Sequence, residues 1–109
     1  MKTRVQSIHF DADQKLLNFI QKKVEKLEQF HDNIISSEVY LRLEKTTDEA
    51  NKIAEIKLNI PGSMLFVKEQ CKSFEEATDL ALDSLLRQIS KHKSKVRNRV
   101  SVEDRNLNA

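Results

Sequence analysis

The sequence contains one glycine, one proline, one cysteine and no tryptophan among its 109 residues. Phosphate-binding loops and dinucleotide-binding fingerprints need several glycines, so the scarcity of glycine excludes both. A single cysteine excludes an intrachain disulfide and a cysteine-rich zinc site. No apolar run stands at the N-terminus, so we expect neither a signal peptide nor a membrane span. We therefore expect a cytoplasmic protein of one domain.

The chain also lacks a strong overall charge. It has 19 Lys and Arg against 17 Asp and Glu, a net charge of +2 that indicates no partner by itself. The charges are unevenly distributed, however. From Glu75 to Asp83 there are four acids and no base, whereas from Arg87 to Arg99 there are six basic residues and no acid. A continuous stretch that reverses its sign in this way indicates a negatively charged partner for its basic half.

The hydrophobic pattern predicts six elements in the order β-α-β-β-β-α. A helical stripe and an alternating strand are told apart by their periods of 3.6 and 2 residues. Strands are expected at residues 4–10, 34–45, 53–60 and 64–71, and helices from Asp11 or Asp13 to about Phe30 and from Ser73 onward. Pro61, Gly62 and Ser63 form a turn between the last two strands, and Ser73 with Glu76 fits a capping box.

The apolar side chains of these elements share one face in each case. The residues expected to point inward from the two middle strands are Val39, Leu41, Leu43, Ala54, Ile56, Leu58 and Ile60. The helical stripes are Leu16, Ile20, Val24 and Leu27, then Phe74, Ala77, Ala81, Leu85 and Ile89. This pattern predicts an α+β two-layer sandwich with both helices on one face of a four-stranded sheet. Residues 1–100 would form the domain, and residues 101–109 a polar tail.

No group of residues has the spacing of a catalytic or metal site. The three histidines, His9, His31 and His92, fall in different elements without a ligand-spaced partner. Cys71 is expected to be a small buried hydrophobe, and the pair Asp79 and Asp83 to lie on a solvated helix face. We therefore expect no enzyme, no cofactor and no metal.

Two basic features indicate a polyanion partner. Lys15, Lys22 and Lys26 form a stripe on the first helix with Lys23 beside it, and the second helix ends in the basic run. Such a helix end can lie along phosphates and release their counterions. No recognition-helix pair is visible, and the outer sheet face lacks the aromatic cluster of an RRM. Shape-based binding of folded RNA is therefore the expected mode.

The sequence resembles the family of ribosome hibernation-promoting factors and ribosome-associated translation inhibitors, also called sigma-54 modulation proteins. The resemblance covers about residues 1–97 and depends on the element order, on residues 22–28 and above all on residues 83–95. It implies a fold like a double-stranded-RNA-binding domain with an added first strand. It also implies a short form, without the C-terminal dimerisation domain of long members. We expect a monomer in solution.

The resemblance further implies a function without covalent chemistry. Family members bind the small ribosomal subunit at the decoding region, occlude mRNA and tRNA, and silence translation in stationary phase or stress. The positions that match basic or polar family positions, and so are expected to contact rRNA, are Lys23, Lys26, Arg87, Gln88, Lys91 and Lys95. His92 and Lys93 match some members only. Two alternatives stay open: a free double-stranded-RNA-binding module, and a protein-interaction domain for an acidic partner.

Overall fold

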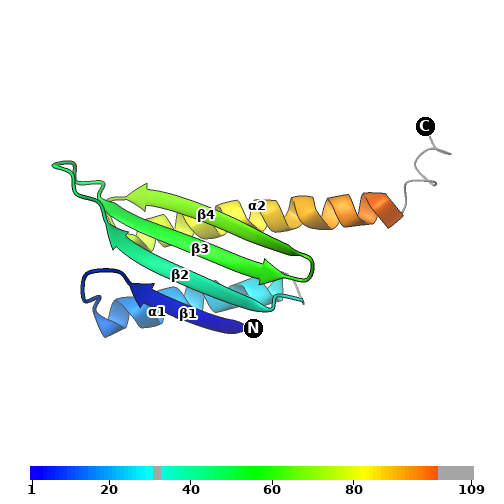
Figure 1. Ribbon diagram of the computed structural model, residues 1–109, viewed down its shortest axis with the longest axis horizontal. Helices are drawn as coiled ribbons and strands as arrows, with labels where there is room; N and C mark the ends of the chain where they lie inside the picture. Colours follow the sequence, from blue (N-terminus) through cyan, green and yellow to red (C-terminus); the bar gives the residue numbers. More distant parts are fainter. Residues whose placement is uncertain (31–32, 101–109) are drawn as a thin grey trace.

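The computed structural model (Figure 1) describes residues 1–30 and 33–100, the side chains of residues 92–100 excepted. Its elements follow the predicted order β-α-β-β-β-α. They are β1 (Lys2–Ser7), α1 (Gln14–Glu25), a short 3₁₀ helix η1 (Lys26–Gln29), β2 (Ser36–Leu43), β3 (Lys52–Ile60), β4 (Ser63–Cys71) and α2 (Phe74–Val100). His31 and the predicted tail at 101–109 lie outside the described residues.

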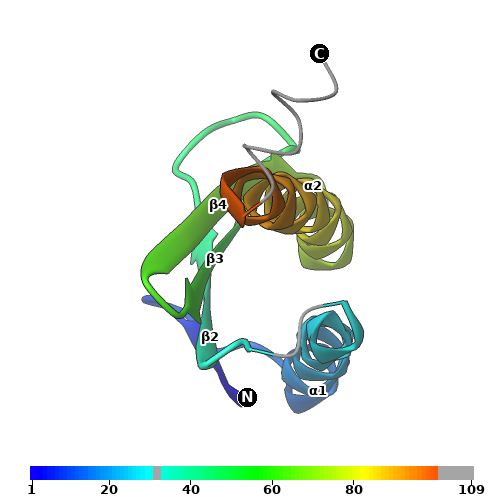
Figure 2. The same ribbon diagram turned by 90° about the vertical axis from the view of Figure 1, so that its right-hand side faces the viewer.

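The four strands form one mixed sheet in the order β1-β2-β3-β4. β1 runs parallel to β2, as the helical connection between them predicts, and the other two pairs are antiparallel. Figure 2 shows both helices on the same side of the sheet. The predicted two-layer α+β sandwich is therefore confirmed, and none of the described helices covers the opposite face of the sheet.

The core lies between the inner sheet face and the two helices. Its fully buried side chains come from every layer, among them Val24 of α1, Ile56 of β3 and Leu85 of α2. The predicted inward residues are buried with one exception, Leu43, which is 47% exposed. β1 ends opposite Leu41, so Leu43 has no neighbouring strand on that side, and the prediction that it points into the core was wrong.

Several predicted boundaries also differ from the structure by one or two residues, among them those of β2, expected at 34–45 and observed at Ser36–Leu43. Two larger differences concern the ends of β1 and α1. β1 ends at Ser7 rather than at residue 10, because His9 adopts a left-handed conformation with φ 62° and turns the chain. Phe10 still joins the core from this loop, with its ring stacked on that of Phe74 at 5.3 Å between centroids. α1 ends at Glu25, and the last predicted turn is the 3₁₀ helix η1, a common form at helix ends.

The helix starts follow the predicted caps. The side chain of Asp13 accepts a hydrogen bond from the backbone N–H of Lys15, and Ser73 Oγ accepts one from the N–H of Glu76 at 3.1 Å. Gly62 has a φ of 74°, which explains why glycine occupies the turn before β4. Figure 1 shows that α2 continues well beyond the edge of the sheet, as the thinning of its apolar pattern past Ile89 predicts. In the described part of the chain no helix is long and apolar enough to cross a membrane.

One buried polar group predicts a stabilising substitution. Thr78 is fully buried in α2, and its hydroxyl has no hydrogen-bond partner within the described residues. Thr78→Val keeps the shape and removes the desolvated hydroxyl, so we expect it to raise the free energy of unfolding by about 1 kcal/mol. Urea unfolding followed by circular dichroism measures this change.

The matched control is Thr47→Val, at an exposed loop position, which should change the stability by less than about 0.5 kcal/mol. A loss of stability in Thr78→Val would show that the buried hydroxyl makes a favourable interaction.

Candidate nucleic-acid interface

Three of the cations on α1 and η1 are exposed, and a fourth forms an ion pair with the other helix. Lys15, Lys22 and Lys26 are exposed, whereas Lys23 is half-buried and faces α2. Lys23 Nζ lies 3.4 Å from Asp79 Oδ1 and 5.4 Å from the centroid of the Phe19 ring. A partly exposed pair of this kind contributes about 0–1 kcal/mol. Lys23 is therefore held by an acid of the other helix, a contact that the sequence pattern did not predict.

A groove of about 400 Å³ runs between the two helices. Its lining combines apolar side chains with charges of both signs. The lining residues are Lys23, Lys26, Leu27, Phe30, Asp79, Leu82, Asp83 and Leu86. Because the two acids of α2 face the two lysines, the groove is not a purely cationic surface. Of the predicted contact residues whose side chains the structure describes, it brings together Lys23 and Lys26.

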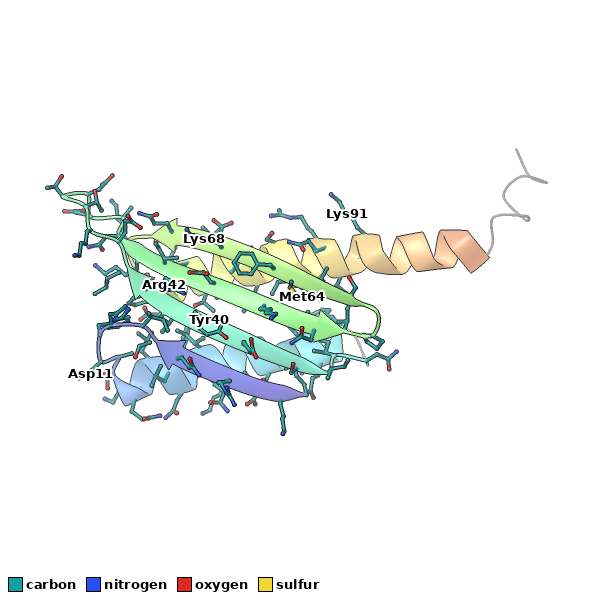
Figure 3. The ribbon with its side chains drawn as sticks, in the orientation of Figure 1. Asp11, Tyr40, Arg42, Met64, Lys68 and Lys91 are labelled. Atoms are coloured by element: carbon teal, nitrogen blue, oxygen red, sulfur yellow. The ribbon has the colours of Figure 1, made fainter. Side chains whose placement is uncertain are left out.

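A separate cationic face lies on the second half of α2. Arg87 and Lys91 are exposed, and neither forms an ion pair with the side chains that the structure describes. Residues four apart turn by about 40° around a helix, so the row from Asp79 through Asp83 to Arg87 and Lys91 leaves the groove step by step. In Figure 3, Lys91 projects away from the body of the protein. The structure therefore separates a cationic face on α2 from the groove of mixed charge between the helices.

The macrodipole of α2 favours the acidic residues at its start. Glu75 and Glu76 occupy its first turn, near the positive end of the helix dipole. The two acids therefore stabilise the start of the helix. Arg87 and Lys91 lie more than two turns before its end at Val100, so the dipole does not engage them and they are available for a partner.

Gln88 has a structural contact that the sequence did not reveal. It is half-buried, and its Nε2 donates a hydrogen bond to the backbone carbonyl of Phe66 at 3.5 Å. This carbonyl lies on β4, an edge strand, so Gln88 helps to cover the open edge of the sheet. The predicted contact residues His92, Lys93 and Lys95 lie in α2, and their side chains are outside the described ones.

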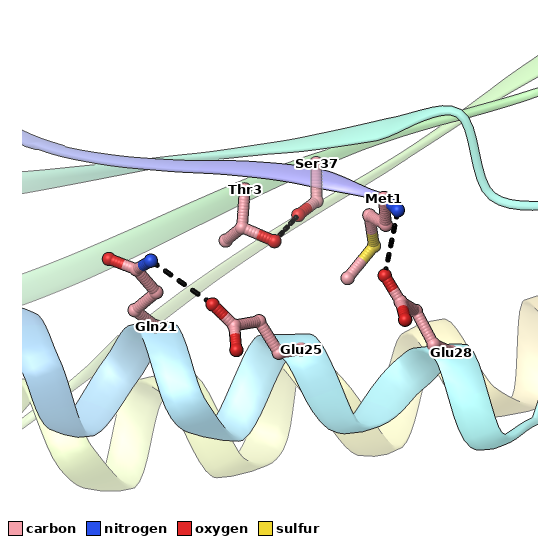
Figure 4. A network of polar contacts seen from close by, with 6 residues as sticks. All are labelled: Met1, Thr3, Gln21, Glu25, Glu28 and Ser37. Carbon is pink, nitrogen blue, oxygen red and sulfur yellow. Dashed lines mark hydrogen bonds and ion pairs between the residues drawn. The ribbon is translucent and has the colours of Figure 1, made fainter.

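Polar contacts at the other edge of the sheet fix β1 on the domain. Figure 4 shows the amino group of Met1 paired with Glu28 at 2.8 Å, and Ser37 Oγ donating to Thr3 Oγ1 at 3.2 Å. Gln21 also donates to Glu25 on α1 at 3.1 Å. These contacts tie η1 and β2 to the first strand, so the added strand is part of the rigid body.

In the described part of the chain, Cys71 and Asp79 have structural contacts rather than the surroundings of a catalytic group. Cys71 is buried, as predicted, and burial, reinforced by Glu76 and Glu69, raises the pKa of its thiol. A thiol with a raised pKa is a poor nucleophile at neutral pH. Asp79 is 54% exposed and paired with Lys23, and within the described residues no group of three or more potential ligands gathers to hold a metal.

The fold and the charged helix define a class of small β-α-β-β-β-α proteins with a basic second helix. The family model described as "Sigma 54 modulation protein / S30EA ribosomal protein" matches residues 3–97. The chain belongs to this family, and the resemblance seen in the sequence is confirmed.

Individual relatives agree with this family. The chain is 29% identical over 97 residues to a ribosome hibernation promoting factor of Klebsiella oxytoca, covering 89% of this chain and 98% of the relative. The factor of the same name from Escherichia coli K12 is 28% identical with the same coverage. In Pseudomonas putida the identity is 27%, over 87% of this chain and 89% of the relative.

Two solved structures share the fold. A ribosomal subunit interface protein from Coxiella burnetii superposes with a TM-score of 0.75 at 20% identity, covering 86% of this chain and 99% of that protein. The N-terminal domain of Thermus thermophilus Protein Y superposes with a TM-score of 0.69 at 22% identity, over 84% and 99% of the two chains.

Proposed function

We propose that this chain is a ribosome hibernation factor that acts without covalent chemistry. It binds the small ribosomal subunit at the decoding region and blocks the mRNA and tRNA sites, which silences translation in stress or stationary phase. Membership of the family supports the proposal, as do the names of the relatives. The match covers 98% of the length of both relatives, so it is not confined to a fragment of them.

The observation that carries the proposal is the face formed by Arg87 and Lys91. Two exposed cations without an ion-pair partner among the described side chains are available to phosphates. Both side chains are exposed, and Lys91 projects away from the body of the protein, so rRNA can approach this side of α2 (Figure 3). Blocking by volume then needs only a folded domain of sufficient size, and this one extends over 56 × 28 × 18 Å.

The predicted contact residues differ in what each offers to rRNA. Arg87 and Lys91 supply free charge, and Lys26 supplies an exposed charge at the rim of the groove. The charge of Lys23 is partly offset by its ion pair with Asp79. Gln88 supports the interface chiefly through its hydrogen bond to β4. His92, Lys93 and Lys95 extend the basic run and remain part of the proposed surface.

Co-sedimentation tests the proposal. Purified protein is mixed with isolated small and large subunits, separated on sucrose gradients at low and moderate salt, and detected in each fraction. We expect co-migration with the small subunit that weakens as salt rises. Protein that stays at the top of the gradient at both salts contradicts the proposal. Equal binding to plain duplex RNA would indicate a free duplex-RNA-binding module instead.

The pair between Lys23 and Asp79 gives a second test of the interface. Asp79→Asn removes the carboxylate from Lys23 and leaves its full charge for phosphates. We expect affinity for the small subunit to rise by about 1.4- to 5-fold, because an exposed pair is worth about 0.2–1 kcal/mol. Asp48→Asn, in the exposed loop between β2 and β3, removes the same charge as a control and should have no effect. Unchanged or weaker binding by Asp79→Asn would remove Lys23 from the interface.

A further inference from the structure

The outer face of the sheet lies on the side away from the helices, and no described element covers it (Figure 3). The labelled side chains Tyr40, Arg42, Met64 and Lys68 all lie on it. The strand register places further residues on the same face, because side chains in one cross-strand row share a side. The charged and aromatic members of this outer face are Lys2, Arg4, Glu38, Tyr40, Arg42, Glu55, Lys57, Phe66 and Lys68.

Cations outnumber carboxylates on the outer face, and both carboxylates already have a partner. Glu55 pairs with Arg42, and Glu38 accepts a hydrogen bond from the hydroxyl of Tyr40 at 3.0 Å. The hydrogen bond to Glu38 raises the pKa of Tyr40, so this hydroxyl stays neutral. The remaining cations form no ion pair with any described residue; they are Lys2, Arg4, Lys57 and Lys68.

Exposed apolar side chains stand among these cations. Phe66 is 48% exposed and Met64 is 51% exposed, two residues apart on the edge strand β4. The register sets Lys57 beside Phe66, and Lys68 follows on the same face of β4. An exposed aromatic ring between unpaired cations is the arrangement with which single-stranded nucleic acids are bound, since bases stack on the ring while phosphates contact the cations.

A hollow continues this surface toward β1. It measures about 420 Å³ and is lined by Lys2, Thr3, Arg4, Ser36, Ser37 and Glu38. Arg4, Glu38, Lys57 and Phe66 occupy one cross-strand row, so the row leads from the hollow to the exposed ring. Phosphates have Arg4 to contact at the end of the row beside the hollow, and Lys57 next to the ring of Phe66.

We propose that the outer face of the sheet binds a single-stranded polynucleotide, with a base stacked on Phe66 and phosphates on Lys57, Lys68 and Arg4. A duplex does not fit this role, because its bases are stacked on one another and offer no free face to the ring. The surface shares no residue with the cationic face of α2. The proposal therefore goes beyond the proposed function and does not depend on it.

Removal of the ring tests the stacking. Fluorescence anisotropy measures the affinity of a labelled 12-residue oligouridylate, and of the matching oligothymidylate, for the protein. Phe66→Ala should weaken binding about 5- to 150-fold, since base stacking on an aromatic side chain is worth about 1–3 kcal/mol. Leu80→Ala removes an exposed apolar side chain, 43%, from α2 on the helix side and should leave the affinity unchanged. Binding of either oligonucleotide supports the proposal, and the one that binds more tightly shows whether the partner is RNA or DNA.

Removal of the cations tests the phosphate contacts. Lys57→Gln combined with Lys68→Gln should lower the slope of log affinity against log salt by about 1.4, at about 0.7 for each phosphate contact on a single strand. Equal affinities for wild type and Phe66→Ala would overturn the proposal. So would displacement of the strand by an acidic peptide such as oligoglutamate at equal charge, or a dimer in solution that Phe66→Ala dissociates.

The two proposals are tested by separate variants, so either can fail without the other. Arg87→Glu with Lys91→Glu should lose the small subunit and keep the sensitivity of oligonucleotide binding to Phe66→Ala. Phe66→Ala should keep co-sedimentation with the small subunit. Circular dichroism of each variant confirms that it is folded, which is expected because Phe66, Lys57 and Lys68 lie outside the buried core.

Discussion

Arg87→Glu combined with Lys91→Glu should weaken binding to the small ribosomal subunit by about 10²- to 10⁴-fold. Each lost contact between a cation and a phosphate costs about 1.5–3 kcal/mol, and a tenfold change in affinity corresponds to about 1.4 kcal/mol. Both side chains are exposed and have no partner among the described residues, so the variant should keep the thermal stability of the wild type within about 0.5 kcal/mol. Titration of labelled protein with subunits measures the affinity.

Lys45→Glu combined with Lys72→Glu is the matched control for this variant. It changes the net charge by the same amount at two exposed positions, and Lys72 has only a distant pair with Glu49 at 3.9 Å. We expect at most a few-fold loss of affinity. An equal loss in both variants would show that net charge, rather than the face on α2, determines binding. Full binding by the Arg87 and Lys91 variant would remove this face from the interface.

The affinity for the small subunit should fall by roughly 10³–10⁵ between 50 and 200 mM salt. This range follows if about six to ten phosphates are contacted, because each contact releases a condensed counterion. The wild-type slope of log affinity against log salt should exceed that of the Arg87 and Lys91 variant by about 2, one for each lost contact. A slope near zero would indicate a protein surface on the ribosome as the partner and would contradict binding through rRNA phosphates.

The elements of the fold follow from local periodicity. Alternation in β3 predicts the buried side chains Ala54, Ile56 and Leu58, and the helical stripe of α2 predicts Leu85 and Ile89. These patterns reflect which face of an element meets the core, so they can be read from neighbouring residues. The helix starts follow for the same reason, because a capping side chain lies within three residues of its partner.

The errors arise where the end of an element depends on a distant part of the chain. Leu43 continues the alternation of β2, yet it is exposed because β1 ends opposite Leu41. The end of β1 in turn depends on the backbone of His9, whose left-handed conformation is more common for histidine than for most residues but is still adopted by only a minority of them. Local patterns carry no information about the length of a neighbouring strand.

The candidate site was predictable in its residue types and less so in their roles. Charge along α2 indicated Arg87 and Lys91, which are indeed free of partners among the described side chains. The pairing of Lys23 with Asp79 and the hydrogen bond from Gln88 to Phe66 join residues 56 and 22 positions apart. Contacts between elements that pack only in the folded protein set these roles, so the sequence alone did not separate engaged from available residues.

A cryo-EM reconstruction of the small subunit saturated with this protein tests the central claim most directly. We predict density for the two-layer domain between the head and body at the decoding region, with Arg87 and Lys91 of α2 against rRNA phosphates. The mRNA and tRNA sites should be filled by the domain. Density at another location on the subunit, or a decoding region left open to tRNA, would contradict the account.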